Sequence, residues 1–219
     1  MELLVVTLAH TIPGRDADGL ARIRLISETV RNAHGLVTAR FYRSRGSESY
    51  YFMLTTWEDE DSWRKAQERY NPKLLLLGSA SELLLDPPEQ WLMHYLWGYS
   101  RPAAEPILAA AHLATMRPDQ AERTQRGWIE SLRRQAVQPT LSLAFLARGV
   151  NEDATASLPS LSLHSTAVAD SPYGSIFLNI LSWASEADRE EFYADLNYQA
   201  ISRFLGSVGV VQIITLDPL

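Results

Sequence analysis

The sequence predicts an α+β protein made of two tandem copies of one βαββαβ unit, which is the element order of a ferredoxin-like fold. Two observations lead to this prediction. Each half has a strand that ends in a tryptophan and continues into a helix, at Trp57 and again at Trp183, an offset of 126. Each half also has an Arg-Gly pair after its second strand, at 45–46 and at 148–149, an offset of 103. The offset therefore grows between the second and third strands, and a loop at 150–174, rich in Ser, Ala, Asp and Pro, supplies the extra residues.

The first half shows the expected elements in order. Its opening strand is apolar from the start, and its first helix carries one apolar stripe, which includes Leu20, Ile23 and Ile26. Gly35 is placed to end that helix. The predicted elements are a strand at 3–9, a helix at 16–33, strands at 36–43 and 50–56, a helix at 60–77 and a strand at 91–97.

The second half repeats the order. Pro118 and Asp119 open its first helix, and Ser185 followed by Asp188 resembles a capping box at the start of its second. The predicted elements are strands at 107–114, 141–147 and 176–181, with a long helix at 186–205. We therefore expect one domain at 1–100, a linker at 101–105 and a second domain at 106–219.

One face of each four-stranded sheet would be bare, because both helices of such a unit lie on the other face. A second copy of the sheet is the obvious cover. The duplication therefore predicts antiparallel sheets packed as an intramolecular dimeric α/β barrel, a pseudo-dimeric monomer that is free to dimerise further.

The composition narrows the class of protein. The net charge of −6, without any basic run, argues against nucleic-acid binding. The absence of cysteine excludes disulfides, thiolate metal sites and cysteine nucleophiles. The longest apolar runs are far shorter than the ~20 residues that span a bilayer, so no membrane association and a cytoplasmic location are expected.

Local motifs for bound cofactors are missing. The five histidines form no pair at metal-ligand spacing, so we expect no metal site. Either His94 or His112 is an alternative haem ligand, although a hydrogen-bonded structural role is the simpler explanation for each. No glycine-rich nucleotide loop occurs, so no tightly bound cofactor is expected. A reduced flavin, FADH2 or FMNH2, stays open as a diffusible co-substrate.

The sharpest local feature is Asn179, an amide within an apolar strand, four residues before Trp183. Burying such an amide costs free energy unless it is hydrogen-bonded. Two readings remain open at this point: a structural hydrogen bond to neighbouring backbone, or donation to a ligand oxygen inside the barrel.

These residues resemble the antibiotic-biosynthesis monooxygenase superfamily of dimeric α/β barrels. The resemblance rests on Thr-Trp-Glu-Asp-Glu at 56–60 and Ser-Trp-Ala-Ser-Glu at 182–186, and it covers nearly the whole chain, once per half. Anthrone oxygenases of this superfamily place an Asn four residues before the Trp, as at Asn179. The first half departs from this pattern with Met53. The fused two-copy form is most similar to the ring-cleaving oxygenases of atypical angucycline biosynthesis.

The resemblance implies an oxygenase that acts on a phenolic polycyclic aromatic, such as an angucyclinone, with O2. Hydroxylation, quinone formation and C–C ring cleavage are the implied outcomes, without metal and with a flavin reductase as the partner if reduced flavin takes part. It implies Asn179 and Trp183 as catalytic residues. The implied substrate-binding residues, of which Tyr51, Tyr173 and His164 are also candidate proton relays, are Trp57, Trp63, Tyr51, Met53, Tyr173 and His164.

Two other classes of function remain open. The superfamily also contains haem-degrading proteins, so a haem-binding or haem-degrading barrel is one alternative. A non-catalytic barrel that binds small aromatic molecules is the other.

Overall fold

The computed structural model describes residues 2–46, 49–101, 106–150 and 175–219 of the chain. These fall into two compact units: Met1–Tyr95 with Thr215–Leu219, and Leu96–Ile214. The predicted linker at 101–105 and the predicted loop at 150–174 lie almost entirely outside the described residues.

The first unit has the predicted βαββαβ order, with its second helix in two pieces and a short 3₁₀ turn before the last strand. Its elements are β1 (Leu3–His10), α1 (Asp16–Val30), β2 (Leu36–Ser44), β3 (Tyr50–Trp57), α2 (Glu60–Tyr70), α3 (Pro72–Ser79), η1 (Ser81–Leu83) and β4 (Glu89–Ser100).

The second unit has the same order of strands and helices, but its 3₁₀ turn comes before the first helix instead of before the last strand. Its elements are β5 (Leu108–Met116), η2 (Pro118–Gln120), α4 (Ala121–Gln135), β6 (Leu141–Gly149), β7 (Ser175–Trp183), α5 (Glu186–Ala194), α6 (Leu196–Val208) and β8 (Gly209–Pro218). The prediction of an α+β protein with two ferredoxin-like repeats is confirmed.

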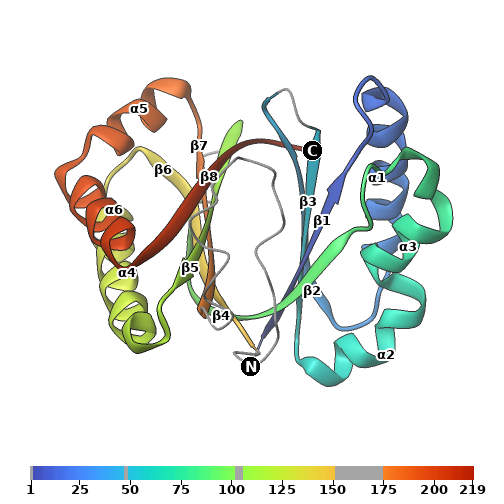
Figure 1. Cartoon of the computed structure of the whole chain (residues 1–219), viewed down its shortest axis with the longest axis horizontal. Helices are drawn as coiled ribbons and strands as arrows, with labels where there is room; N and C mark the ends of the chain where they lie inside the picture. Colours follow the sequence, from blue (N-terminus) through green and yellow to red (C-terminus); the bar gives the residue numbers. More distant parts are fainter. Residues whose placement is uncertain (1, 47–48, 102–105, 151–174) are drawn as a thin grey trace. The chain divides into compact units, whose positions relative to one another are not determined.

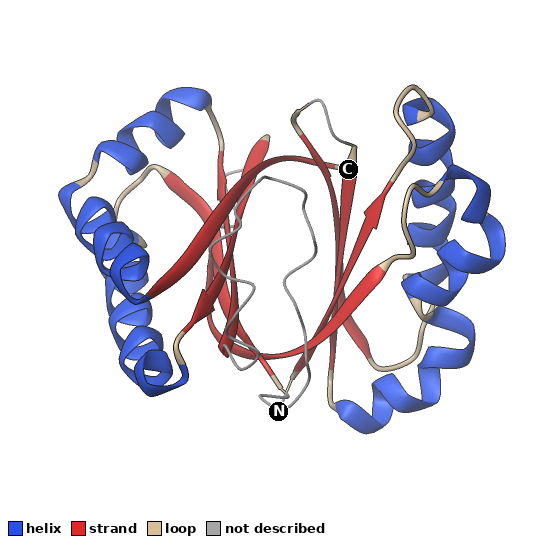
Figure 2. Cartoon of the chain, in the orientation of Figure 1, coloured by secondary structure: helices blue, strands red, loops and turns tan. Residues whose placement is uncertain are grey.

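Within each unit the helices cover one face of an antiparallel sheet. Helices α1, α2 and α3 lie along β1, β2 and β3, and α4, α5 and α6 lie along β5, β6 and β7 (Figures 1 and 2). In the first unit β3 pairs with both β1 and β2, and β1 also pairs with β4. In the second unit β7 pairs with both β5 and β6, and all of these pairs are antiparallel.

Strand register gives the true alignment of the two repeats. Trp57 lies opposite Leu3 and Leu36, and Trp183 lies opposite Leu108 and Leu141. Each register shifts by one residue at the same place, directly after Leu36 and directly after Leu141. The offset for the first two strands is therefore 105, and the offset of 103 predicted from the Arg-Gly pairs is wrong by two residues.

The long second helix predicted for each repeat is in fact broken. Pro72 cannot continue a helix that needs its N–H, and the side chain of Asn71 accepts a hydrogen bond from the N–H of Lys73 to start α3. In the second repeat Asp195 takes this role, since its side chain accepts from the N–H groups of Asn197 and Tyr198. The break is a shared feature of the repeats.

Candidate active site

The side chain of Asn179 points toward the helices. Asn179 lies directly opposite His112 on the paired strand β5, so the two side chains share one face of the sheet. That face is covered by helices, because the His112 ring reaches Tyr198 on α6. Strand alternation turns its neighbours Leu178 and Ile180 to the opposite face of this sheet.

Asn179 and Trp183 belong to a cluster of aromatic and polar side chains between the sheet and the helices. Trp183 follows Asn179 by two full strand repeats, so both lie on the same face of β7. The ring centroids of Trp183 and Tyr193, on α5, lie 5.5 Å apart, and those of Tyr193 and Tyr198 lie 4.9 Å apart. We define the His112 cluster as His112, Asn179, Trp183, Tyr193 and Tyr198.

The break between α5 and α6 positions both tyrosines. Tyr193 is the last but one residue of α5, and Tyr198 is the third of α6. Asp195, between them, accepts from the Tyr198 N–H at 3.1 Å and from the Gln138 side chain at 3.0 Å. A continuous helix would turn residues five positions apart to different directions. The break lets both rings meet His112, each at 6.1 Å between centroids.

Four buried polar atoms of this cluster have no hydrogen-bond partner: His112 Nδ1, Asn179 Oδ1, Trp183 Nε1 and Tyr193 Oη. Each such atom costs about 1–3 kcal/mol relative to a hydrogen-bonded one. They comprise an imidazole nitrogen, an amide oxygen that accepts, an indole N–H that donates and a hydroxyl that can do both. Such a set fits a ligand that carries both a hydroxyl and a carbonyl or oxyanion.

Burial keeps the cluster uncharged. It lowers the pKa of His112 to about 4, although the adjacent backbone of Asn179 acts in the opposite direction. Burial also raises the pKa of Tyr198 to about 12. It raises the pKa of Tyr193 well above its usual value, although the nearby Arg189 charge lowers that pKa in part. At neutral pH the cluster therefore holds a neutral imidazole and two protonated phenols.

The predicted residues of the first repeat lie on the helix-covered face of their own sheet. Met53 and Tyr51 are fully buried within an apolar cluster that includes Ile23 and Phe41. Trp57 contacts Trp63 at 5.2 Å between ring centroids. The structure thus brings together two groups of predicted residues, one in each repeat.

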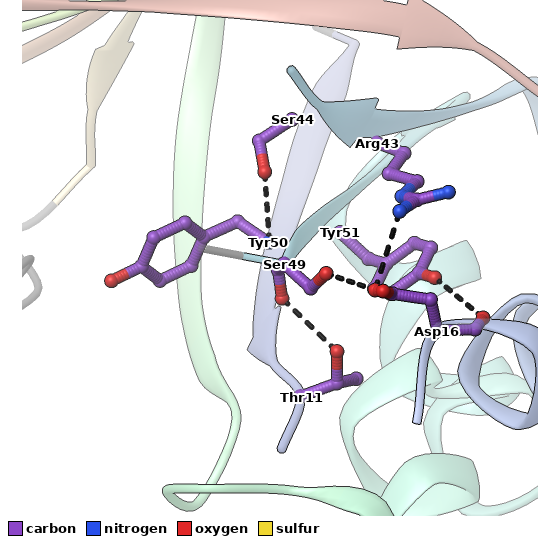
Figure 3. A network of polar contacts seen from close by, with 7 residues as sticks. All are labelled: Thr11, Asp16, Arg43, Ser44, Ser49, Tyr50 and Tyr51. Atoms are coloured by element: carbon purple, nitrogen blue, oxygen red, sulfur yellow. Dashed lines mark hydrogen bonds and ion pairs between the residues drawn. The ribbon is translucent and has the colours of Figure 1, made fainter. Parts of the chain in front are cut away.

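Tyr51 belongs to a structural network at the start of α1 (Figure 3). Its hydroxyl donates to the Asp16 carbonyl oxygen at 3.3 Å, and the Asp16 carboxylate accepts from Ser49 and pairs with Arg43 at 3.3 Å. The Thr11 hydroxyl donates to the Ser49 carbonyl at 3.2 Å. With these partners Tyr51 joins α1 to β3.

The remaining sequence candidates do not join these groups. His164 and Tyr173 lie outside the described residues, and His94 is exposed on β4. Within the described ranges, no group of histidine and carboxylate side chains is arranged to hold a metal ion. No helix in the described part of the chain is long and apolar enough to cross a membrane.

Sequence reasoning missed Tyr193 and Tyr198, and it considered His112 as a hydrogen-bonded structural residue or a haem ligand, not as part of this site. Their signal was present but weak. Asp195, two residues after Tyr193 and directly before an apolar residue, is a typical helix N-cap and could have indicated the break. His112 interrupts an otherwise apolar strand much as Asn179 does.

Comparison with known proteins gives the family of the first repeat. Residues 3–69 match the antibiotic biosynthesis monooxygenase family. No curated protein sequence matches the chain.

Solved structures with little sequence identity share the fold over the whole chain. A proposed monooxygenase from Fusobacterium nucleatum has a TM-score of 0.76 at 6% identity, covering 100% of this chain and 92% of its own. An anthrone oxidase-like protein has a TM-score of 0.70 at 12% identity, covering 100% of this chain and 91% of its own. The chain is therefore similar to the antibiotic biosynthesis monooxygenase family over residues 3–69, and it shares its fold with these solved structures.

Proposed function

We propose that this protein is an oxygenase of antibiotic-biosynthesis type, acting with O2 on a phenolic polycyclic aromatic bound at the His112 cluster. One observation carries the proposal: four unpartnered polar atoms of the His112 cluster lie among aromatic rings beside an apolar core. Flat aromatic ligands pack well against such rings. Binding a hydroxyl and an oxyanion of the ligand would satisfy atoms that are costly to bury alone.

Trp183 and Asn179 would have different roles in this reaction, because one donates a hydrogen bond and the other accepts one. Trp183 Nε1 can donate to a ligand oxyanion, and Asn179 Oδ1 can accept from a ligand hydroxyl. A donor that is fixed before the charge develops stabilises the anion more than water does, because it need not reorient. The phenolate or carbanion that results is the species electron-rich enough to reduce O2.

The electron balance defines two variants of the reaction. Oxidation of a ring CH2 to a carbonyl consumes one O2 and releases one water, and it needs no other reductant. Hydroxylation or oxygen insertion before ring cleavage also releases one water, but it takes two further electrons and two protons. A reduced flavin delivered by a flavin reductase would supply these as a co-substrate.

Oxygen uptake tests the proposal. The purified protein is given anthrone-type and angucyclinone-type phenols in an oxygen electrode, with and without a flavin reductase. We expect Asn179→Ala and Trp183→Phe to slow oxygen uptake by about tenfold or more. His34→Gln changes an exposed histidine outside both groups of candidate residues, and it should leave the rate unchanged.

Two outcomes would contradict the proposal. Equal rates for the wild type and both second-repeat variants would remove Asn179 and Trp183 from the reaction. Tight binding of the phenols without oxygen uptake in either condition would indicate a binding protein instead of an oxygenase.

A further inference from the structure

A hydrogen bond joins the buried end of the His112 cluster to a residue closer to its surface. His112 is 3% exposed, and its Nε2 lies 3.2 Å from Tyr198 Oη. Tyr198 is half-buried on α6. Its backbone N–H is fixed by Asp195, so the phenol is held in place by its own helix start.

We propose that His112 is the proton acceptor of this site and that Tyr198 passes it the proton of the bound hydroxyl. This inference rests on the proposed function, since it assumes a phenolic ligand at the His112 cluster. It assigns a catalytic role to Tyr198, which would touch the ligand, and makes His112 the base behind it.

The proton transfer balances without any other reactant. The O–H bond of the ligand breaks as a new O–H bond forms on Tyr198, while the original Tyr198 proton moves to His112 Nε2. The products are a ligand oxyanion and an imidazolium, so no electrons are exchanged. In a site without water, attraction between these two charges is far stronger than in solvent.

The side chains that face His112 leave its imidazole unprotonated in the free protein. Asn179 faces it from β7, Tyr193 from α5 and Tyr198 from α6, and none of these side chains is charged at neutral pH. Arg189 is the cation that acts on Tyr193, where it opposes the larger effect of burial on the Tyr193 pKa. The imidazole is therefore unprotonated in the free protein, with its lone pair available.

Two observations separate this role from a purely structural histidine. A structural His112–Tyr198 bond gives no reason for unpartnered polar atoms beside it, yet Asn179, opposite His112, and Tyr193, in ring contact with it, each have one, and so does His112 at Nδ1. In the first repeat the position of His112 is taken by Thr7, which accepts a hydrogen bond from Gln90 at 2.9 Å. The shared fold therefore does not need an imidazole at this place.

A coloured phenol tests the inference without turnover. A dihydroxyanthraquinone changes its visible absorbance when its hydroxyl ionises, so its spectrum reports proton transfer directly. We expect the bound probe to ionise at least about one pH unit below its value in water. His112→Gln and Tyr198→Phe should bind the probe with a similar Kd but leave it un-ionised, and His34→Gln, on an exposed histidine, should behave as wild type.

The outcomes separate the two proposals. If the wild-type protein does not bind the probe, the proposed phenolic ligand class fails. If the probe binds and ionises equally in His112→Gln and Tyr198→Phe, the proton-acceptor inference is overturned while the oxygenase proposal stands. Should His112→Gln fail to fold, Tyr198→Phe alone decides the question, because loss of one hydroxyl leaves the ring packing intact.

Discussion

The two repeats share a backbone frame but fill the same place differently. Thr7, Met53 and Thr55 of the first repeat correspond by register to His112, Asn179 and Leu181 of the second. In the first repeat every one of these polar groups has a partner: Thr7 accepts from Gln90, and the Thr55 hydroxyl accepts from Trp57 Nε1 at 3.0 Å.

The second repeat lacks these partners. Leu181 cannot accept a hydrogen bond, so the indole N–H of Trp183 is left without one. Asn179 brings a polar oxygen to the place where Met53 is apolar. At these equivalent positions the first repeat has hydrogen-bonded polar groups, whereas the second has unpartnered ones whose burial costs free energy.

Exchanging the residues at the Met53 and Asn179 positions should give the largest effect. Met53→Asn puts an amide into a fully buried apolar cluster, and we expect it to lower the free energy of unfolding by about 3–5 kcal/mol. Asn179→Leu keeps the number of side-chain atoms and removes an unpartnered oxygen, so stability should be unchanged or rise by about 1 kcal/mol.

Urea unfolding monitored by tryptophan fluorescence measures both variants. Equal destabilisation by the two substitutions would show that the native side chain stabilises its repeat equally at both positions. The comparison between a functional and a supporting repeat would then lose its main basis.

The pH dependence of stability should depend on His112, for which the first repeat has only Thr7. The folded pKa of about 4 lies below the unfolded value of 6.5, so the folded state holds His112 neutral. As pH falls from 6.5 toward 4, only the unfolded state gains this proton, and stability is lost through that window. The loss at pH 4.5 relative to pH 7 should be about 2–3 kcal/mol.

Comparing wild type with His112→Gln isolates this contribution from the carboxylates. Between pH 7 and pH 4.5 the free energy of unfolding of His112→Gln should fall by about 2–3 kcal/mol less than that of the wild type. His34→Gln should behave as the wild type. Identical pH dependence in all three proteins would mean that His112 is not held neutral by burial.

The tryptophan pair should give the smallest difference. Trp57→Phe and Trp183→Phe remove the same atoms from fully buried rings, but only Trp57 loses a hydrogen bond. We expect Trp57→Phe to be more destabilising by about 1 kcal/mol, measured by thermal unfolding. A larger loss for Trp183→Phe would indicate that its indole N–H is hydrogen-bonded in solution.

Much of the fold was predictable because its signals are local. The apolar stripe of α1, the tryptophan that ends β3 and β7, and the caps at Asp59 and Ser185 each depend on neighbours a few residues away. The helix breaks were less visible, since Asn71 and Asp195 act through backbone N–H groups that a helical pattern would otherwise use.

The duplication and the element order follow from the amino-acid sequence alone, which also predicts Asn179 and Trp183 as site residues. Only the tertiary structure decided which face Asn179 occupies and that His112, Tyr193 and Tyr198 lie beside it. Strand alternation predicts which residues share a face but not which face the helices cover. The meeting of β5, β7 and two helix ends is a long-range contact that no local pattern encodes.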